Sequence, residues 1–149
     1  MPSDLRSRLD AMFRSDQFAA GLGARLVEWG AGCATVEWAP RPDQVNFAGG
    51  VHGGAIFSLA DLAFSYACNS WGRACVALSV TIEFLSAPAV AVPLTATATE
   101  KSRRRTIAAY DLSVTGPGGL VASCTAMAFR TQGWHFGADA WPGEYRDHY

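Results

Sequence analysis

The stretch that most constrains the fold of this chain runs from residue 45 to residue 71, where a glycine-rich segment leads into a long apolar run. Four glycines surround His52, and good helix formers follow as far as about Asn69, with Gly72 as a stop signal. This pattern predicts a glycine-rich loop that opens a helix of about four turns. Apolar residues fall on all sides of that helix, which is typical of a helix buried in the core.

Asp61 is the only charged residue between Gly53 and Trp71, so its place in a buried helix needs a reason. A buried carboxylate is unfavourable unless it is paired, hydrogen-bonded or placed in a wet cleft. One interpretation is structural: Ser58, Asp61 and Ser65 form a narrow stripe that simply faces water. The other is chemical, because a helix N-terminus built from glycines exposes backbone N–H groups that suit an anion or a developing oxyanion.

A longer motif runs through this stretch, N-x-x-x-x-x-H-G-G-x-x-x-x-x-x-D, made up here of Asn46, His52, Gly53, Gly54 and Asp61. Together with F-S-L-A-D-L-A-F-S-Y-A-C-N-S around the aspartate and T-I-E-F-L further along, it resembles the hotdog-fold acyl-CoA thioesterases of the phenylacetic-acid-degradation (PaaI-like) type. The similarity runs from about residue 46 to residue 131. The same fold also hosts dehydratases and acyl binders, so the function must be argued from the site.

The resemblance implies hydrolysis of acyl-CoA thioesters, aromatic (phenylacetyl-type) or medium-chain, to free acid and CoA, with no cofactor. The backbone N–H of Gly53 would stabilise the oxyanion, with Gly54 beside it as a substrate-binding residue. Asp61 would act as general base for water or as nucleophile, and both roles need it ionised. Asn46 would hydrogen-bond the substrate or the water, and His52 would hold the loop or contact the region of the thioester sulfur.

Some relatives place a hydroxyl or a second acid on the strand after the helix to position the water. Here Ala77 lies near that point, with Ser79 and Thr81 on the same expected strand face. The group that positions the water is therefore left open.

The spacing of Gly53 and Asp61 has a consequence that does not depend on the family. The two residues are eight apart, which corresponds to about 12 Å of rise along one helix. They cannot both reach one thioester carbonyl, so the donor and the carboxylate should come from facing helices related by a two-fold axis. This predicts a homodimer with composite sites, and the resemblance implies pairing of dimers into a homotetramer.

Six segments rich in strand formers surround the central helix: 22–29, 33–39, 75–85, 94–101, 105–115 and 120–131. Pro- and Gly-containing turns separate them, and the last four are expected to be antiparallel neighbours in chain order. A sheet of this size can bury one long apolar helix only by curling around it. The expected fold is α+β: a hotdog with about six antiparallel strands wrapped around one long helix.

The whole chain, 1–149, is expected to form a single thioesterase domain with two appendages. Residues 1–20 hold a short amphipathic helix with Ser3 as its N-cap. The tail 132–149 carries Trp134, Phe136, Trp141 and Tyr145, and these aromatic side chains are expected to dock on the same subunit or a neighbour.

Composition narrows the possible partners to a small molecule. A formal net charge of −1 gives no electrostatic footprint for nucleic acid. The three histidines show no metal-ligand spacing, and the four cysteines, without a C-x-x-C pair, are expected to be reduced core residues. With no signal peptide and no span long enough to cross a membrane, the chain is expected to be cytoplasmic.

The turn at residues 101–105 is the one basic cluster, and it has two interpretations. It is either a solvated hairpin turn or a site where Arg103 and Arg104 bind the phosphates of coenzyme A, since guanidinium groups suit phosphate. Two alternative functions also stand beside hydrolysis. They are a hotdog acyl-thioester dehydratase or hydratase, and a non-catalytic acyl-CoA-binding protein.

Overall fold

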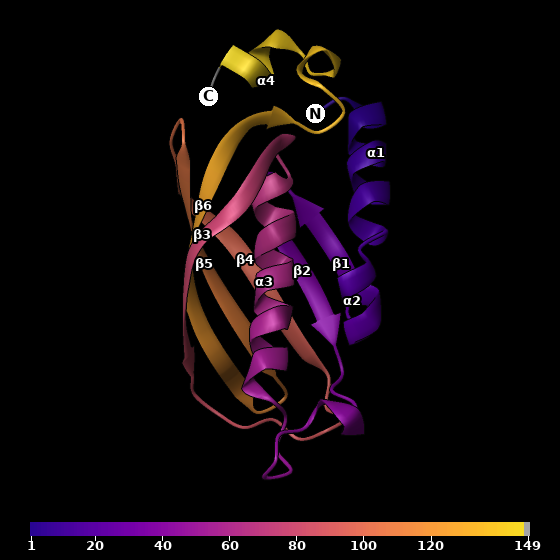
Figure 1. The fold of residues 1–149 in the computed structure, drawn as a ribbon, viewed down its shortest axis with the longest axis vertical. Coiled ribbons are helices and arrows are strands. Elements are labelled where there is room, and N and C mark those ends of the chain that lie inside the picture. The colour runs from indigo at the N-terminus through magenta and orange to yellow at the C-terminus, as the bar shows by residue number, and fades with distance from the viewer. Residues whose placement is uncertain (148–149) are drawn as a thin grey trace.

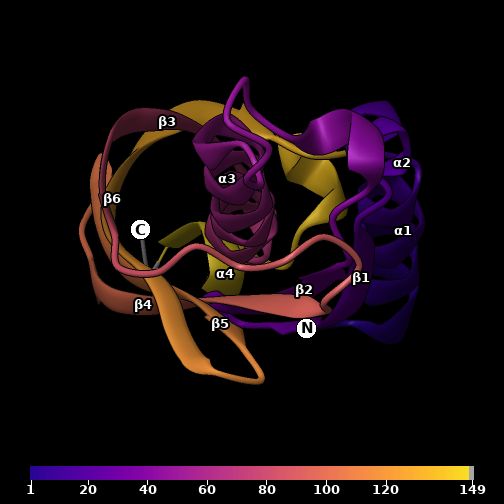
Figure 2. The ribbon, with the colours of Figure 1, turned by 90° about the horizontal axis from the view of Figure 1, so that it is seen from below.

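A six-stranded antiparallel sheet wrapped around one helix dominates the structure, a computed structural model that describes residues 1–147 (Figure 1). The central helix is α3 (Gly53–Asn69), and the strands are β1 (Arg25–Gly30), β2 (Cys33–Trp38), β3 (Arg73–Phe84), β4 (Leu94–Arg103), β5 (Ile107–Gly116) and β6 (Gly119–Trp134). Their order in the sheet is β1-β2-β4-β5-β6-β3. Seen along the helix, the sheet curls around α3, which confirms the predicted hotdog architecture (Figure 2).

The central helix begins and ends where the sequence indicates. The His52 side chain caps its first turn, with Nδ1 accepting a hydrogen bond of 2.9 Å from the Gly54 N–H. At the other end Gly72 takes a left-handed φ of 86°, which a residue with a Cβ adopts only with strain. Ten residues of α3 are buried, including Leu59, Ala63 and Phe64, so its apolar surface forms the centre of the core.

The strand neighbours differ from the expectation at one place. β4, β5 and β6 are antiparallel neighbours in chain order, but β3 pairs with β6 and not with β4. β4 pairs instead with β2, for example through Val36 and Ala96. The segment between β3 and β4 contains Pro88 and Pro93, which lack the N–H that a tight hairpin would use, and it crosses the open end of the sheet as an irregular connection (Figure 1). β3 therefore forms one edge of the sheet.

The N-terminal segment forms two helices, α1 (Ser3–Arg14) and α2 (Gln17–Leu22), where one was expected. Asp16 is the N-cap of the second helix, and its Oδ1 accepts hydrogen bonds from the N–H groups of Phe18 and Ala19. Leu22 therefore belongs to α2, and the expected strand 22–29 starts later, at Arg25.

The expected cap of the first helix is also wrong. Pro2 occupies the N-cap position of α1 without a side-chain hydrogen bond, and Ser3 is the first helical residue. Leu5, Leu9 and Phe13 are buried, which confirms the amphipathic pattern.

The aromatic tail packs on its own chain. It contains the short 3-10 helix η2 (Ala138–Ala140) and the helix α4 (Gly143–Asp147); another short 3-10 helix, η1 (Pro42–Gln44), precedes the glycine loop. Trp141 is 1% exposed, and its ring lies against Trp134 and Tyr145. Gly72 leaves room for it, because a Cβ there would lie 2.1 Å from the indole ring. Within residues 1–147, no helix has the length and apolar character needed to span a membrane.

Candidate active site

The glycine loop before α3 is organised by Asn46. Its Oδ1 accepts hydrogen bonds from the N–H of Ala48 at 2.9 Å and of Gly50 at 3.1 Å. Its own N–H donates to the Gly50 carbonyl at 2.7 Å, which closes the loop. The side-chain carbonyl that was expected to meet the substrate or the water thus holds the loop in this chain, and the Nδ2 amide remains as the group that a substrate can use.

The first residue of α3 presents an N–H suited to an oxyanion. Gly53 lies after the His52 cap, and its N–H has no acceptor among residues 1–147. A Cβ at this position would lie 3.4 Å from the ring of Phe84, at the end of β3. The helix N-terminus adds a positive partial charge at the same point. The neighbouring Gly54 N–H is already bound to His52, so Gly53 is the donor that remains available.

Asp61 lies on the one stripe of α3 that the sheet leaves uncovered. The stripe runs through Gly54, Ser58, Asp61 and Ser65, all exposed or half-buried, whereas ten of the other residues of the helix are buried. Within the described chain the Asp61 carboxylate has no hydrogen-bond or ion-pair partner. Desolvation by its half-buried surroundings raises the pKa of Asp61 above the ordinary 3.8. A carboxylate so placed is a stronger base than one on an open surface.

One chain does not bring the donor and the carboxylate together. Gly53 and Asp61 lie on the same straight helix, eight residues apart, so about 12 Å of rise separates them. Asn46 and His52 lie with Gly53 at the N-terminal end of α3. Each chain therefore carries the two groups apart: an available backbone N–H at the start of α3, and a carboxylate further along the helix.

Ser79 and Thr81 do not face this site. A β-bulge between Ala77 and Ser79 shifts the register of β3, so that Ala77 pairs with the buried Ala128, whereas Ser79 pairs with Met127. Directly paired residues lie on the same side of a sheet. Ser79 and Thr81 therefore lie on the outer face, away from α3, and the expectation that all three share one face is wrong.

The two arginines of the basic cluster have different surroundings. Arg103 ends β4 with its side chain turned inward: its Nε lies 3.2 Å from Glu100 Oε1, and its guanidinium stacks on the Trp71 ring at 3.6 Å. Arg104 is exposed in the turn and accepts a hydrogen bond on its carbonyl from Arg130 Nη1. The contact of Arg103 with Trp71 places the turn between β4 and β5 near the C-terminal end of α3, whereas Gly53 is at the N-terminus of that helix (Figure 1).

A cavity of about 330 Å³ opens one helical turn beyond Asp61. Its lining includes Ser65, Asn69, Met12, Cys75 and His135. Sequence reasoning did not find this cavity, because its walls come from α1, α3, β3 and the tail. No group of three or more His, Cys, Asp or Glu side chains in the described chain could hold a metal ion.

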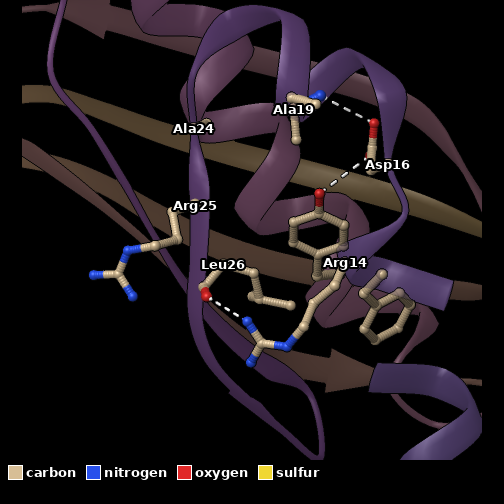
Figure 3. A pocket seen from close by; sticks show the side chains of 9 residues that line it. Arg14, Asp16, Ala19, Ala24, Arg25 and Leu26 are labelled. Atoms are coloured by element: carbon tan, nitrogen blue, oxygen red, sulfur yellow. Dashed lines mark hydrogen bonds between the residues drawn. The ribbon is translucent and has the colours of Figure 1, made fainter. Parts of the chain in front are cut away.

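A second cavity, of about 190 Å³, lies between the N-terminal helices and β1 (Figure 3). Its polar groups satisfy one another: Tyr66 donates to Asp16 Oδ2 at 3.1 Å, and Arg14 Nη1 donates to the Leu26 carbonyl at 3.0 Å. None of the site residues expected from the sequence lines it. The first contact joins the N-cap of α2 to α3, and the second joins α1 to β1.

Comparison with known proteins identifies the family of this architecture. Residues 48–123 match the model of the thioesterase superfamily. The acyl-coenzyme A thioesterase PaaI of Escherichia coli K12 is 38% identical over 104 residues, which cover 70% of this chain and 74% of that protein.

Solved structures of similar fold point to the same family. The structure of E. coli PaaI matches with a TM-score of 0.82 and 34% identity, over 87% of this chain and 94% of that one. A thioesterase protein of Streptococcus pneumoniae, solved with coenzyme A, matches with a TM-score of 0.76 and 25% identity, over 84% and 98% of the two chains. The chain therefore belongs to the thioesterase superfamily, as a PaaI-like member with the hotdog fold.

Proposed function

We propose that this chain, a PaaI-type thioesterase, hydrolyses acyl-CoA thioesters at composite sites, each built from two subunits. The observation that carries this proposal is the pair of half-sites on α3: an available N–H at Gly53 and an unpaired, half-desolvated carboxylate at Asp61. The first suits the oxyanion of a tetrahedral intermediate, and the second suits activation of water or direct attack on the carbonyl.

The edge of the sheet supports the dimer that this chemistry requires. β3 is an edge strand of 12 residues, and Val76, Leu78 and Phe84 on it are each more than half exposed. A long edge strand with exposed apolar residues favours pairing with another strand. Antiparallel pairing of β3 with its symmetry mate would cover these residues and set the two α3 helices side by side in opposite directions.

In this dimer Gly53 of one subunit would polarise the thioester carbonyl, and Asp61 of the other would act on the water or the carbon. Glycine at position 53 would let the thioester carbonyl approach this N–H, because no Cβ stands beside it. Asn46 and His52 would hold the donor loop in shape. The available Asn46 amide could also hydrogen-bond the substrate.

The cavity beyond Asp61 is the proposed place of the acyl group. It begins at Ser65, about 6 Å of rise from Asp61, and Met12 and Phe13 supply apolar walls. A volume of about 330 Å³ is at the small end of ligand pockets, which favours an arylacetyl or a medium-chain acyl group over a long one. Arg104, on the outside, is proposed to contact the phosphates of coenzyme A.

A thiol-release assay over a panel of acyl-CoAs, with a chelator present, tests the activity. Hydrolysis releases one free thiol per turnover, whereas hydration of an unsaturated acyl-CoA and simple binding release none. We expect turnover with arylacetyl and medium-chain substrates and much less with long chains. A folded protein that releases no thiol from any member of the panel would reject hydrolysis.

Mixed dimers test whether the site is composite. Asp61→Ala and Asn46→Ala damage opposite halves of each site, so both homodimers should be impaired. In a mixed dimer the two lesions fall in one site and leave the other intact. Co-refolding the variants in equal amounts should give about half mixed dimers and so roughly a quarter of the wild-type specific activity. If the mixture contains heterodimers but is no more active than the separate variants, both residues serve one subunit's site.

A further inference from the structure

Cys68, near the end of α3, and Cys75, near the start of β3, meet around the side chain of Asn69. Asn69 Nδ2 lies 3.4 Å from Cys68 Sγ and 3.3 Å from the Cys75 carbonyl oxygen, and Asn69 Oδ1 accepts the Cys75 N–H at 2.9 Å. The Cys68 thiol donates to the Ser65 carbonyl and the Cys75 thiol to the Arg73 carbonyl, each at 3.4 Å. Both cysteines thus contact the same Asn69 side chain, which makes them neighbours in space, as a disulfide between them requires.

The two thiols differ in their readiness to ionise. The neighbouring Cys68 thiol and the nearby Arg130 and Arg73 guanidinium groups lower the pKa of Cys75. The Cys75 thiol, burial and the charge of Asp61 raise the pKa of Cys68. Cys75 is thus the more acidic thiol of the pair, and the thiolate is the form that reacts with oxidants.

Of the two cysteines, Cys75 is the one that a small molecule in the cavity can contact. Cys75 is half-buried and lines the cavity of about 330 Å³ beside Met12, Asn69 and His135, whereas Cys68 lies buried behind it. A molecule the size of hydrogen peroxide can therefore reach Cys75 first. The other two cysteines lack this arrangement: Cys33 is exposed on β2, and burial with the charge of Glu83 raises the pKa of Cys124 to about 11.

We propose that Cys75 and Cys68 form a peroxide-sensitive dithiol pair, in which Cys75 is oxidised and Cys68 resolves the product. The Cys75 thiolate attacks one oxygen of hydrogen peroxide; a sulfur–oxygen bond forms, the oxygen–oxygen bond breaks, and the leaving hydroxide takes up a proton as water. Cys68 then attacks the sulfenic sulfur of Cys75. A disulfide forms, and the second oxygen leaves as water with the Cys68 proton.

The net step oxidises two thiols by two electrons and reduces one peroxide to two waters. It uses neither Gly53 nor Asp61 as a reacting group, although Cys75 lines the cavity proposed for the acyl group. The structure holds both cysteines reduced, and the disulfide would join the last turn of α3 to β3. Thiol reductants reverse such a bond.

Thiol counting and peptide mapping test the pair on the full chain. The reduced protein has four cysteines, and treatment with hydrogen peroxide should leave two free thiols under denaturing conditions. Trypsin cuts after Arg73, between the two cysteines, so the oxidised protein should yield peptides 26–73 and 74–101 joined by a bond that a thiol reductant releases. Fragmentation should place that bond on Cys68 and not on Cys33. This measurement needs no variant and so does not depend on the folding of one.

Variants assign the two roles. In Cys68→Ser, Cys75 should stop at the sulfenic acid and be trapped by dimedone; in Cys75→Ser, neither the cross-link nor the adduct should form. Cys124→Ser is the matched control and should still lose two of its three thiols. The proposal is overturned if the wild-type cross-link involves Cys33 or Cys124, if the cysteines oxidise only to sulfonic acids, or if Cys75→Ser keeps the dimedone adduct on Cys68.

Discussion

At the N-terminal end of α3 the backbone donor of Gly53 has no acceptor within residues 1–147, whereas at the C-terminal end every polar group of Asn69 is used. Asn69 Nδ2 also donates to the Ser65 carbonyl, and its Oδ1 lies 2.8 Å from His135 Nε2. The pKa of His135 is lowered by burial, so its ring is neutral and Nε2 acts as the donor to Asn69. One end of the helix is left open for chemistry and the other is fixed to the sheet and the tail.

The difference agrees with the roles proposed for the two ends. An oxyanion donor must be unpaired before the substrate arrives, which is tolerable at an exposed loop. A buried amide without partners would cost free energy, so the closed end is fully hydrogen-bonded. Substitutions on the open half should therefore change turnover, and those at the closed end should change stability.

The largest expected effect is on turnover, in Asp61→Asn, with a loss of about 10²- to 10⁴-fold in kcat. The same variant should be at least as stable as the wild type at neutral pH. The raised pKa means that the folded state favours protonated Asp61, so its stabilising contribution is present at low pH and lost as pH rises through that pKa. Thermal melts beside the rate measurement check both parts. Serious unfolding of the variant would place Asp61 among the structural residues.

The raised pKa of Asp61 also determines where kcat/KM declines at low pH. Asp61 must be ionised to act, so kcat/KM should fall with decreasing pH from a point above the ordinary carboxyl value of 3.8.

Gly53→Ala should lower kcat/KM by about 10²-fold while leaving the melting temperature unchanged or slightly higher. The new Cβ would make ordinary contact with the Phe84 ring at 3.4 Å, and Gly53 does not have a positive φ, so folding tolerates it. It would, however, stand where the thioester carbonyl approaches the N–H. Gly118→Ala, in the open hairpin turn before β6, is the control and should leave activity unchanged. Equal activity of both variants would argue against Gly53 as the donor.

Asn69→Ala should affect stability and not turnover, the opposite of Gly53→Ala. We expect a loss of about 2–4 kcal/mol in the free energy of unfolding, with kcat of the folded fraction nearly retained. The Cys75 N–H and the His135 ring would lose their acceptor in a buried place. Denaturant melts measure the loss, and Ser65→Ala, on the exposed stripe of the same helix, should cost little. A stable but inactive Asn69→Ala would show that the closed end takes part in catalysis.

The smallest effects separate the two arginines near the closed end. Arg104→Ala should raise KM for an acyl-CoA a few-fold, about 1 kcal/mol, and leave KM for a truncated N-acetylcysteamine thioester unchanged. Arg103→Ala should instead lower stability by about 1–2 kcal/mol, because Glu100 and the Trp71 ring lose a largely buried partner. Equal changes of KM with both substrates would make Arg104 part of a structural turn.

Those parts of the fold and of the candidate site that have a local signal could be predicted from the sequence. The glycine loop, the apolar central helix, the strand-rich segments and the spacing of Gly53 and Asp61 depend only on neighbours along the chain. The structure contains all of them, although the first strand starts at Arg25 and not at Leu22. The family motif is also contiguous, which is why it could be found before any coordinates. The helix α2 was missed because its signal is short, a single capping aspartate before six residues.

Which elements lie side by side could not be predicted from the sequence and is known from the folded structure. Strand pairing depends on hydrogen bonds between residues far apart in the chain, so the place of β3 beside β6 could not be read from chain order. One bulge turned Ser79 and Thr81 to the outer face, because side chains alternate and a single extra residue reverses them. Arg103 turned inward and Cys68 met Cys75 for the same reason: long-range packing, and not local pattern, sets which side chains share a space.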